Sequence, residues 1–169
     1  MTLPPCAEMP DISDCVIEDA RWEACDLPSI AERATRAALA VCGLMGEDWE
    51  VAILACDDAR IATLNADFRS KPVPTNVLSW PAEALGAATA GETPLAPEGP
   101  ELGDIAIAFE TCEAEARDQG IEFAAHVAHL IVHAVLHLLG YDHIEDADAT
   151  LMEGLEIKAL ASMGIQNPY

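Results

Sequence analysis

The sequence predicts an α+β fold in which a small mixed sheet of about four strands packs in layers with about five helices. Three observations predict it. Strand-like and helical patterns alternate in the first part of the chain, only helical patterns follow, and 51% of the residues are hydrophobic. A length of 169 residues is typical of one domain, so we expect residues 1–169 to form a single domain around one core.

The N-terminal part supplies two strands and a helix. A strand with alternate side chains on one face is predicted at Cys15–Glu18, and a buried strand at Trp49–Ala55. Between them, the Asp-Leu-Pro of residues 26–28 starts a helix, because proline is tolerated in the first helical turn. Gly43 and Gly46 end it. Its apolar stripe consists of Ile30, Ala34, Ala37, Ala38, Val41 and Leu44.

A short helix is predicted next. Asp57 and Asp58 are suited to cap its first turn with their carboxylates. Its inner face is expected to hold Ile61, Leu64 and Phe68, which recur at helical spacing.

Two further strands flank a segment of different composition. A short strand is expected at Asn76–Trp80, next to proline, and a second at Leu102–Phe109, where isoleucines alternate with small or acidic residues. The intervening Pro81–Pro100 is rich in Ala, Gly, Pro and Glu, which predicts a flexible surface excursion that is dispensable for folding.

The rest of the chain is helical in pattern. One helix is expected from Thr111 to Gln119, and a break at Gly120 separates it from a long helix that ends at Leu139. A C-terminal helix is expected at about Asp146–Ser162.

The charge excludes several classes of protein. Eight basic and 30 acidic residues give a net charge of −22, the opposite of what a general DNA binder or anionic-membrane binder carries. The longest apolar stretch, Ile121–Leu139, is interrupted by glutamate and histidine, so we expect no membrane span. Met1–Asp14 has no Lys, no Arg and no long apolar run, which predicts no signal peptide and a cytoplasmic location.

The six cysteines agree with that location. No two of them form a C-x-x-C pair, which removes the strongest thiolate-metal and redox motifs. A chain of this length and apolarity needs no disulfide framework, so we expect free, mostly buried thiols.

All five histidines lie in one short window, and three have metal-ligand spacing. His133 and His137 are one helical turn apart, so their imidazoles can converge on one ion. Gly140 can adopt a left-handed conformation that ends the helix and delivers His143 from the turn. This H-x3-H-x2-G-x2-H spacing predicts three imidazole ligands and an open position, typical of hydrolytic zinc, although nickel, iron and copper suit the same donors.

Neighbouring residues leave alternatives open. His126 and His129 continue the stripe and are either partners of the ligands or part of a substrate-facing edge. Asp142 is a candidate fourth ligand or a hydrogen-bond acceptor for a ligand. Ala134 stands where a zinc peptidase has its general-base glutamate, which weakens a peptidase hypothesis.

Several segments resemble one family. The string H-L-I-V-H-A-V-L-H-L-L-G-Y-D-H at 129–143 closely resembles the signature of the YbeY family, the bacterial rRNA-maturation endoribonucleases. Segments 64–71, 74–81 and 102–107 are similar to other parts of that family, as is the spacing of Met152, Glu156, Leu160 and Gly164. The resemblance covers about residues 50–164.

The resemblance implies a fold, a metal and an activity. The fold is a small mixed sheet with helices around it, and a single zinc is held by His133, His137 and His143. The activity is single-strand-specific endoribonuclease cleavage in 16S rRNA 3′-end maturation and ribosome quality control. The implied partners are rRNA and the small ribosomal subunit.

Arg69 matches the family's functionally important arginine, and it is the expected catalytic residue. Its guanidinium would hold a phosphate oxygen or stabilise transition-state charge. Lys71 and His129 are expected to contribute to substrate binding. Ala134 departs from the family's usual glycine, and the charge of −22 departs from what an RNA binder needs, so protein partners on the ribosome are expected to supply affinity. Arg60, Arg69 and Lys71 could still form a local basic patch.

Two other functions fit the same residues. The first is a metallohydrolase that acts on a small molecule or peptide. The second is a non-enzymatic ribosome assembly factor with structural zinc. The glycine turn and the lack of a fourth Cys or His nearby favour an open site over a closed structural one.

Overall fold

The computed structural model describes residues 10–45 and 48–169. The helix-ending role predicted for Gly46, the free thiol predicted for Cys6 and most of the Met1–Asp14 segment therefore lie outside the described residues. The other five cysteines are free, as predicted.

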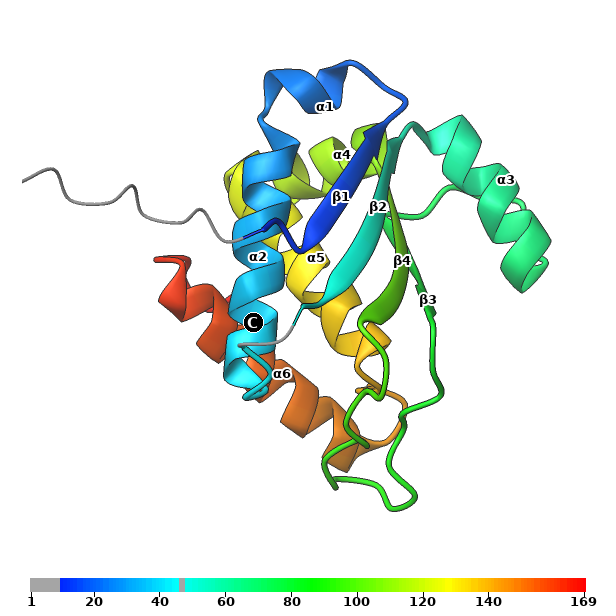
Figure 1. Ribbon diagram of the computed structural model, residues 1–169. Helices are drawn as coiled ribbons and strands as arrows, with labels where there is room; N and C mark the ends of the chain where they lie inside the picture. The colour runs from blue at the N-terminus through cyan, green and yellow to red at the C-terminus, as the bar shows by residue number, and fades with distance from the viewer. Residues whose placement is uncertain (1–9, 46–47) are drawn as a thin grey trace, which may run out of the picture.

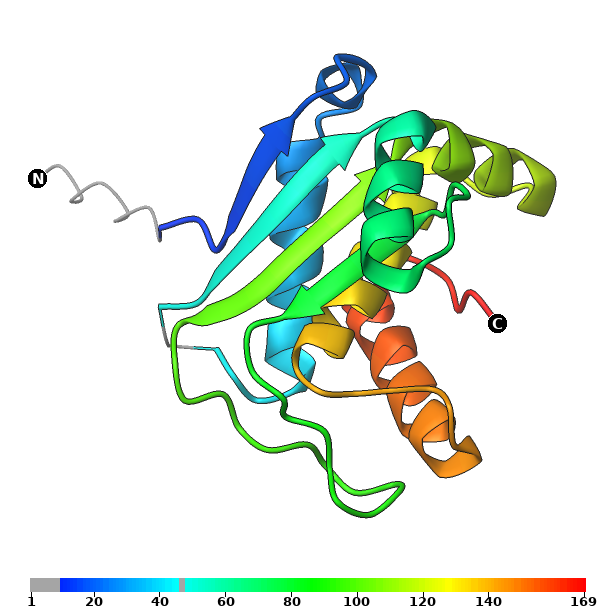
Figure 2. The ribbon, with the colours of Figure 1, turned by 90° about the vertical axis from the view of Figure 1, so that its right-hand side faces the viewer.

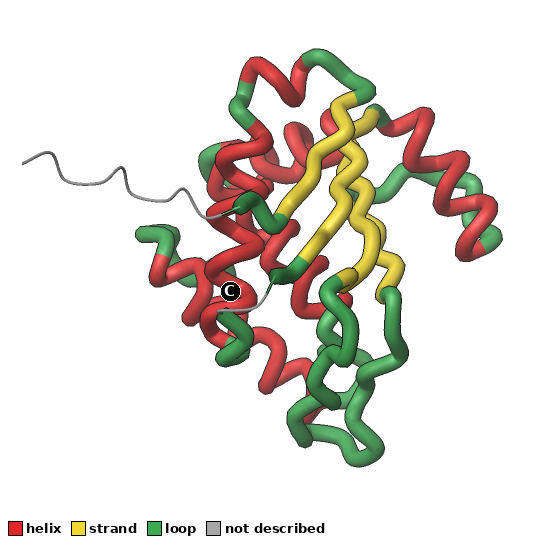
Figure 3. Tube along the Cα trace, viewed as in Figure 1, coloured by secondary structure: helices red, strands yellow, loops and turns green. Residues whose placement is uncertain are grey.

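A mixed sheet in the order β1-β2-β4-β3 forms the centre of the described structure (Figures 1 and 3). The strands β1 (Ser13–Ile17), β2 (Glu50–Cys56) and β4 (Glu101–Ala108) run parallel. The strand β3 (Val77–Pro81) pairs antiparallel with β4 and forms one edge of the sheet. The predicted four-stranded mixed sheet is confirmed.

Helices cover both faces of the sheet. The described residues form α1 (Arg21–Ala24), α2 (Leu27–Val41), α3 (Asp58–Arg69), α4 (Phe109–Gln119), α5 (Phe123–Leu138) and α6 (Asp146–Ser162). Figure 2 shows α3 on one face, with α2 and α5 on the other and α6 packed outside them. The layered α/β class is therefore confirmed, with the one-turn α1 as an addition to the five predicted helices.

Residues 105–108 of the central strand β4 are buried on both faces, which the predicted alternation of isoleucines with small or acidic residues did not capture. Ile105 and Ile107 belong to the main core under α2 and α5. Ala106 and Ala108 belong to a smaller core under α3. β4 lies between β2 and β3, so helices can cover both of its faces. The small alanine side chains on the second face let α3 pack closely against the sheet.

Helix α3 is capped as predicted but packed differently. The Asp57 side chain accepts a hydrogen bond of 2.8 Å from the backbone N–H of Arg60. The prediction that Phe68 lies on the inner face is wrong, because its side chain is 54% exposed. Asn65 is buried instead, and its amide donates to the carbonyl oxygen of Val73 at 3.0 Å. Helical spacing marks a face of the helix. In the last turn of α3 the Phe68 ring packs edge-on against Trp80 of β3, and most of the Phe68 side chain stays exposed.

The connection between β3 and β4 contains no regular element, as predicted, but it contributes to the core. Leu85 is only 6% exposed. It lies against Gly140, where a Cβ atom would come within 2.7 Å of the Leu85 carbonyl carbon. Only glycine tolerates this approach together with a φ of +97°. The excursion is thus anchored at Leu85 beside the end of α5, and its predicted dispensability for folding cannot extend to that residue.

We expect Leu85→Ala to lower the free energy of unfolding by about 2 kcal/mol, because it removes a buried side chain. Leu95→Ala in the same segment is the matched control, since Leu95 is 65% exposed and its truncation should cost less than about 0.5 kcal/mol. Urea unfolding followed by circular dichroism measures both. Equal midpoints for the two variants would show that Leu85 does not anchor the segment.

No single described helix has the length and apolarity to span a membrane. Helices α4 and α5 meet those two criteria only as a pair, and the pair is bent by 115°.

Candidate metal centre

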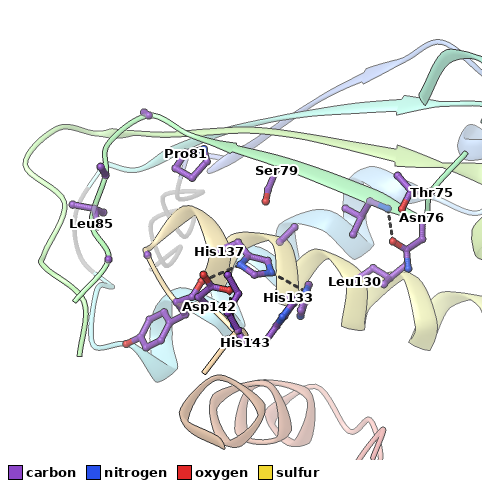
Figure 4. A pocket seen from close by; sticks show the side chains of 18 of the residues that line it. Thr75, Asn76, Ser79, Pro81, Leu85, Leu130, His133, His137, Asp142 and His143 are labelled. Carbon is purple, nitrogen blue, oxygen red and sulfur yellow. Dashed lines mark hydrogen bonds between the residues drawn. The ribbon is translucent and has the colours of Figure 1, made fainter. Parts of the chain in front are cut away.

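Three histidines converge at the C-terminal end of α5 (Figure 4). His133 and His137 project from successive turns of that helix, and His143 comes from the turn that follows. One ring nitrogen from each lies within 4.8 Å of the others. Gly140 has a positive φ, as predicted, and this reversal returns the chain so that His143 faces the helix. The arrangement can hold one metal ion.

A buried glutamate positions one of these histidines. Glu156, on α6, has no exposed surface, and its Oε1 contacts Nδ1 of His133. Its Oε2 accepts from Nε2 of His129 at 3.1 Å and from the hydroxyl of Tyr169. Burial would raise the pKa of Glu156, but these hydrogen bonds outweigh it and lower that pKa to about 2. Glu156 is therefore an anion that orients the His133 ring.

The sequence reasoning did not assign Glu156 a functional role, although a signal exists. Glu156 lies one helical turn from Met152 and one from Leu160, and both of these residues are buried. A glutamate on the apolar face of a helix must be paired, because an isolated buried charge is costly. Two of the partners that Glu156 has are histidines, His129 and His133.

The hydrogen bonds also determine which nitrogens face the site. Nδ1 of His137 lies 2.9 Å from the carbonyl oxygen of Tyr141, which can only accept, so Nδ1 carries the proton. Burial, helped by neighbouring His133, lowers the pKa of His137 to about 4, so the ring is neutral at pH 7. Its Nε2 then presents a lone pair 3.0 Å from Nε2 of His133. The two nitrogens face the same point and can share one cation, which matches a metal site.

The remaining candidates near the ligands have other partners. The Asp142 carboxylate accepts a 2.6 Å hydrogen bond from the backbone N–H of His143, and it is outside the ligand group formed by the described residues. His126 is buried, with Nε2 3.4 Å from Oε1 of Glu115, and it does not line the site. His129 contacts Glu156, which holds the ligand histidine His133, and it also lines the site. It therefore fits both predictions made for it, a partner of the ligands and a part of the substrate-facing edge.

The histidines open into a cavity of about 930 Å³ between α5 and the edge strand β3. Ser79 projects from β3 toward them (Figure 4). Arg69, from the end of α3, lines the same cavity, so the fold brings this predicted residue to the histidines. Lys71 is exposed and does not line it. The predicted patch of three basic residues is not formed, because Arg60, at the other end of α3, pairs with Glu18 at 3.2 Å.

The cavity differs in charge from the rest of the molecule. Among the acidic residues that the structure describes, only Glu83 and Asp142 line it. Within the described part of the chain, Arg69 has no carboxylate within 4.0 Å. An anion can therefore approach this guanidinium despite the net charge of −22.

Fold and site together define an α/β protein in which three histidines that could hold a metal ion line one cavity. The family model described as Endoribonuclease YbeY matches residues 17–164. The chain therefore belongs to the YbeY family of endoribonucleases, as the sequence resemblance indicated.

Individual relatives agree with this assignment. The chain is 60% identical over 161 residues to the endoribonuclease YbeY of Ruegeria pomeroyi, covering 92% of this chain and 96% of the relative. It is 44% identical over 168 residues to that of Rhodopseudomonas palustris, covering 99% and 94%. A solution structure of a Thermotoga maritima protein has a TM-score of 0.56 at 17% identity, covering 90% of this chain and 91% of that one, which shows a shared fold.

We expect Glu156→Gln to lower metal affinity by about 10- to 100-fold, because a neutral amide no longer polarises or fixes the His133 ring. Tyr169→Phe is the matched control, since it removes one hydrogen bond to the same carboxylate and leaves the charge. Competition with a chelator measures both affinities. An affinity of Glu156→Gln equal to that of the unaltered protein would contradict the positioning role.

Proposed function

We propose that the protein is a zinc-dependent endoribonuclease that cleaves single-stranded RNA in the maturation of the 16S rRNA 3′ end and in ribosome quality control. One observation carries the proposal. The three-histidine group and Arg69 line one cavity, although α5 and α3 lie on opposite faces of the sheet (Figure 2), and Arg69 has no carboxylate partner among the described residues. A cation site beside a guanidinium is suited to a phosphodiester, which carries a negative charge through the reaction.

The donor set favours zinc. Zinc–imidazole bonds of about 2.0–2.1 Å in a tetrahedral site separate the ligand nitrogens by roughly 3.4 Å. The Nε2 atoms of His133 and His137 are 3.0 Å apart, so a small adjustment of either ring accommodates the ion. Three neutral imidazoles leave the fourth position open, which is typical of catalytic rather than structural zinc. When bound there, zinc supplies Lewis acidity and lowers the pKa of water.

The roles of the chain's own residues follow from their contacts. Arg69 binds a phosphate oxygen and stabilises charge that develops on it. Glu156 is a positioning residue, because both of its carboxylate oxygens are engaged by side chains and none faces the cavity. Ala134 lines the cavity where a zinc peptidase has its glutamate, so a carboxylate base is missing at that position. These contacts support slow hydrolysis that depends mainly on the metal and Arg69.

The acidic surface supports action on the ribosome rather than on free RNA. A charge of −22 repels a polyanion at long range, and screening by salt shortens that repulsion to about 8–10 Å. Affinity for rRNA would then come from protein partners on the small subunit, which raise the local concentration of substrate. The cytoplasm is the compartment in which we place this activity.

The test uses a 16S precursor within immature small subunits and as free RNA. The zinc-loaded protein should shorten the precursor on subunits, more slowly on free RNA, and not at all after chelation. Correct maturation by a metal-free His133→Ala protein would instead support the non-enzymatic assembly factor. Cleavage of peptides but not of RNA would support a metallohydrolase of another substrate class.

A further inference from the structure

The ladder between β3 and β4 determines which backbone groups of β3 point outward from the sheet. At one end, the N–H of Ala108 donates to the carbonyl oxygen of Asn76 at 3.0 Å. At the other end, the N–H of Ala82 donates to the carbonyl oxygen of Leu102 at 3.0 Å. In an antiparallel pair, residues bonded in this way alternate with residues whose N–H and C=O groups point away from the partner strand. The outward residues of β3 are therefore the odd-numbered ones, Val77, Ser79 and Pro81.

Only one of these three outward residues offers a free backbone donor. Pro81 has no N–H, as in every proline. The N–H of Val77 already donates to the side-chain oxygen of Asn76 at 2.6 Å. The N–H of Ser79 has no backbone or side-chain acceptor among the described residues. All three outward residues line the metal cavity, so this single donor lies at its wall.

The hydroxyl of Ser79 adds a second donor at the same place. Side chains alternate between the two faces of a strand, and those of Leu78 and Trp80 pack in the smaller core under α3. Ser79 therefore faces α5, and Figure 4 shows it projecting toward the histidines. Its hydroxyl makes no hydrogen bond within the described part of the chain. Rotation about the Cα–Cβ bond can turn the hydroxyl toward an acceptor that the N–H of the same residue also reaches.

The surroundings of Ser79 favour an anionic acceptor. The two carboxylates that line the cavity are already held by backbone donors. Glu83 accepts from two N–H groups of the connection between β3 and β4, and Asp142 accepts from the N–H of His143. Arg69 lines the same cavity and has no carboxylate within 4.0 Å among the described residues. A cation site, a guanidinium and two neutral donors around one cavity suit the oxygens of a phosphate.

An added peptide strand is the other ligand that an open sheet edge attracts. Such a strand pairs with a row of alternating donors and acceptors. The outward edge of β3 has one free donor, because the N–H of Val77 is occupied and Pro81 has none. Proline on an edge strand is a means by which proteins prevent strand addition. The edge therefore fits an isolated acceptor better than a second strand.

We infer that Ser79 is a phosphate-binding residue whose backbone N–H and hydroxyl together hold one non-bridging oxygen of the phosphodiester to be cleaved. The inference rests on the proposed function for its substrate class and adds a second contact to the phosphate that Arg69 binds. A donor on a strand is in place before the substrate arrives. It therefore stabilises developing negative charge without reorganisation of the protein.

The experiment replaces one non-bridging oxygen by sulfur, in each of the two configurations, at the bond that the zinc-loaded protein cleaves in a short single-stranded RNA. Sulfur accepts hydrogen bonds weakly, so one configuration should slow the unaltered protein through loss of the contact with Ser79. Ser79→Ala should slow cleavage of the all-oxygen RNA by about 10- to 100-fold, the cost of one hydrogen bond to a charged group. In the same variant, the slowing by sulfur should shrink at least about threefold in that configuration alone.

Two further variants control this measurement. Ser79→Thr keeps both donors and should cleave the all-oxygen RNA within about threefold of the unaltered protein. Ser29→Ala is the matched control, because Ser29 is exposed on α2 and does not line the cavity. Metal content should be the same in all variants, since the described ligand group consists of histidines alone.

The outcomes separate this inference from the proposed function. An all-oxygen rate of Ser79→Ala equal to that of the unaltered protein would overturn the contact, as would sulfur effects that Ser79→Ala leaves unchanged in both configurations. A rate for Ser79→Thr as low as that for Ser79→Ala would also overturn it. In these cases, cleavage by the unaltered protein still supports the endoribonuclease. An unaltered protein that cleaves no RNA would overturn both proposals, and cleavage of peptides in its place would favour strand addition at β3.

Discussion

Replacing His137 with alanine is expected to abolish stoichiometric metal binding. The change removes one of three converging nitrogens, the one whose tautomer the Tyr141 carbonyl determines. The affinity for the metal should fall by more than about 100-fold. Loss of a residue that only supports a ligand costs up to about 100-fold, and loss of a ligand itself should cost more. The measurement is metal analysis of the purified variant for zinc, nickel, iron and copper together. Cleavage of the rRNA precursor should be lost along with the metal.

A matched variant tests whether Asp142 is a ligand. Asp142→Asn retains an oxygen that accepts from the backbone N–H of His143, so the turn should persist. It should keep one metal ion per chain, because the described ligand group consists of histidines alone. Unchanged metal content in His137→Ala would refute the three-histidine site, and metal loss in Asp142→Asn would add a fourth ligand to it.

The second large effect is expected at Arg69. Arg69→Ala should reduce rRNA processing by about 10²–10³-fold, the usual cost of losing one donor that stabilises transition-state charge. Metal content and thermal unfolding should not change, because Arg69 is exposed and lies outside the ligand group. The measurements are precursor cleavage rates, metal analysis and calorimetry on the same preparation.

Two further variants sharpen this result. Arg69→Lys should restore activity only in part, because an ammonium cannot make a planar two-point contact with a phosphate. Arg33→Gln is the charge-matched control, since Arg33 is exposed on α2 and does not line the cavity. Normal processing by Arg69→Ala would contradict a catalytic role and make the assembly-factor hypothesis the better explanation.

Local patterns predicted much of the fold. The C-terminal helix was expected at Asp146–Ser162 and is observed there, and the helix that begins after Asp26 starts with its proline in the first turn. These features depend on neighbours within a few residues, through capping, proline geometry and apolar spacing. The exposed Phe68 shows where such reasoning stops, because spacing cannot say whether a helix turn has anything to pack against.

By itself, the sequence determined the candidate metal-ligand group of three histidines. Helical geometry places His133 and His137 on one face, and a glycine turn returns His143, whatever the rest of the fold does. Only the tertiary structure decided that Glu156, 23 positions from His133, is its partner and that Arg69 reaches the same cavity. Contacts between distant segments depend on how layers pack around one core, and no local spacing specifies that packing.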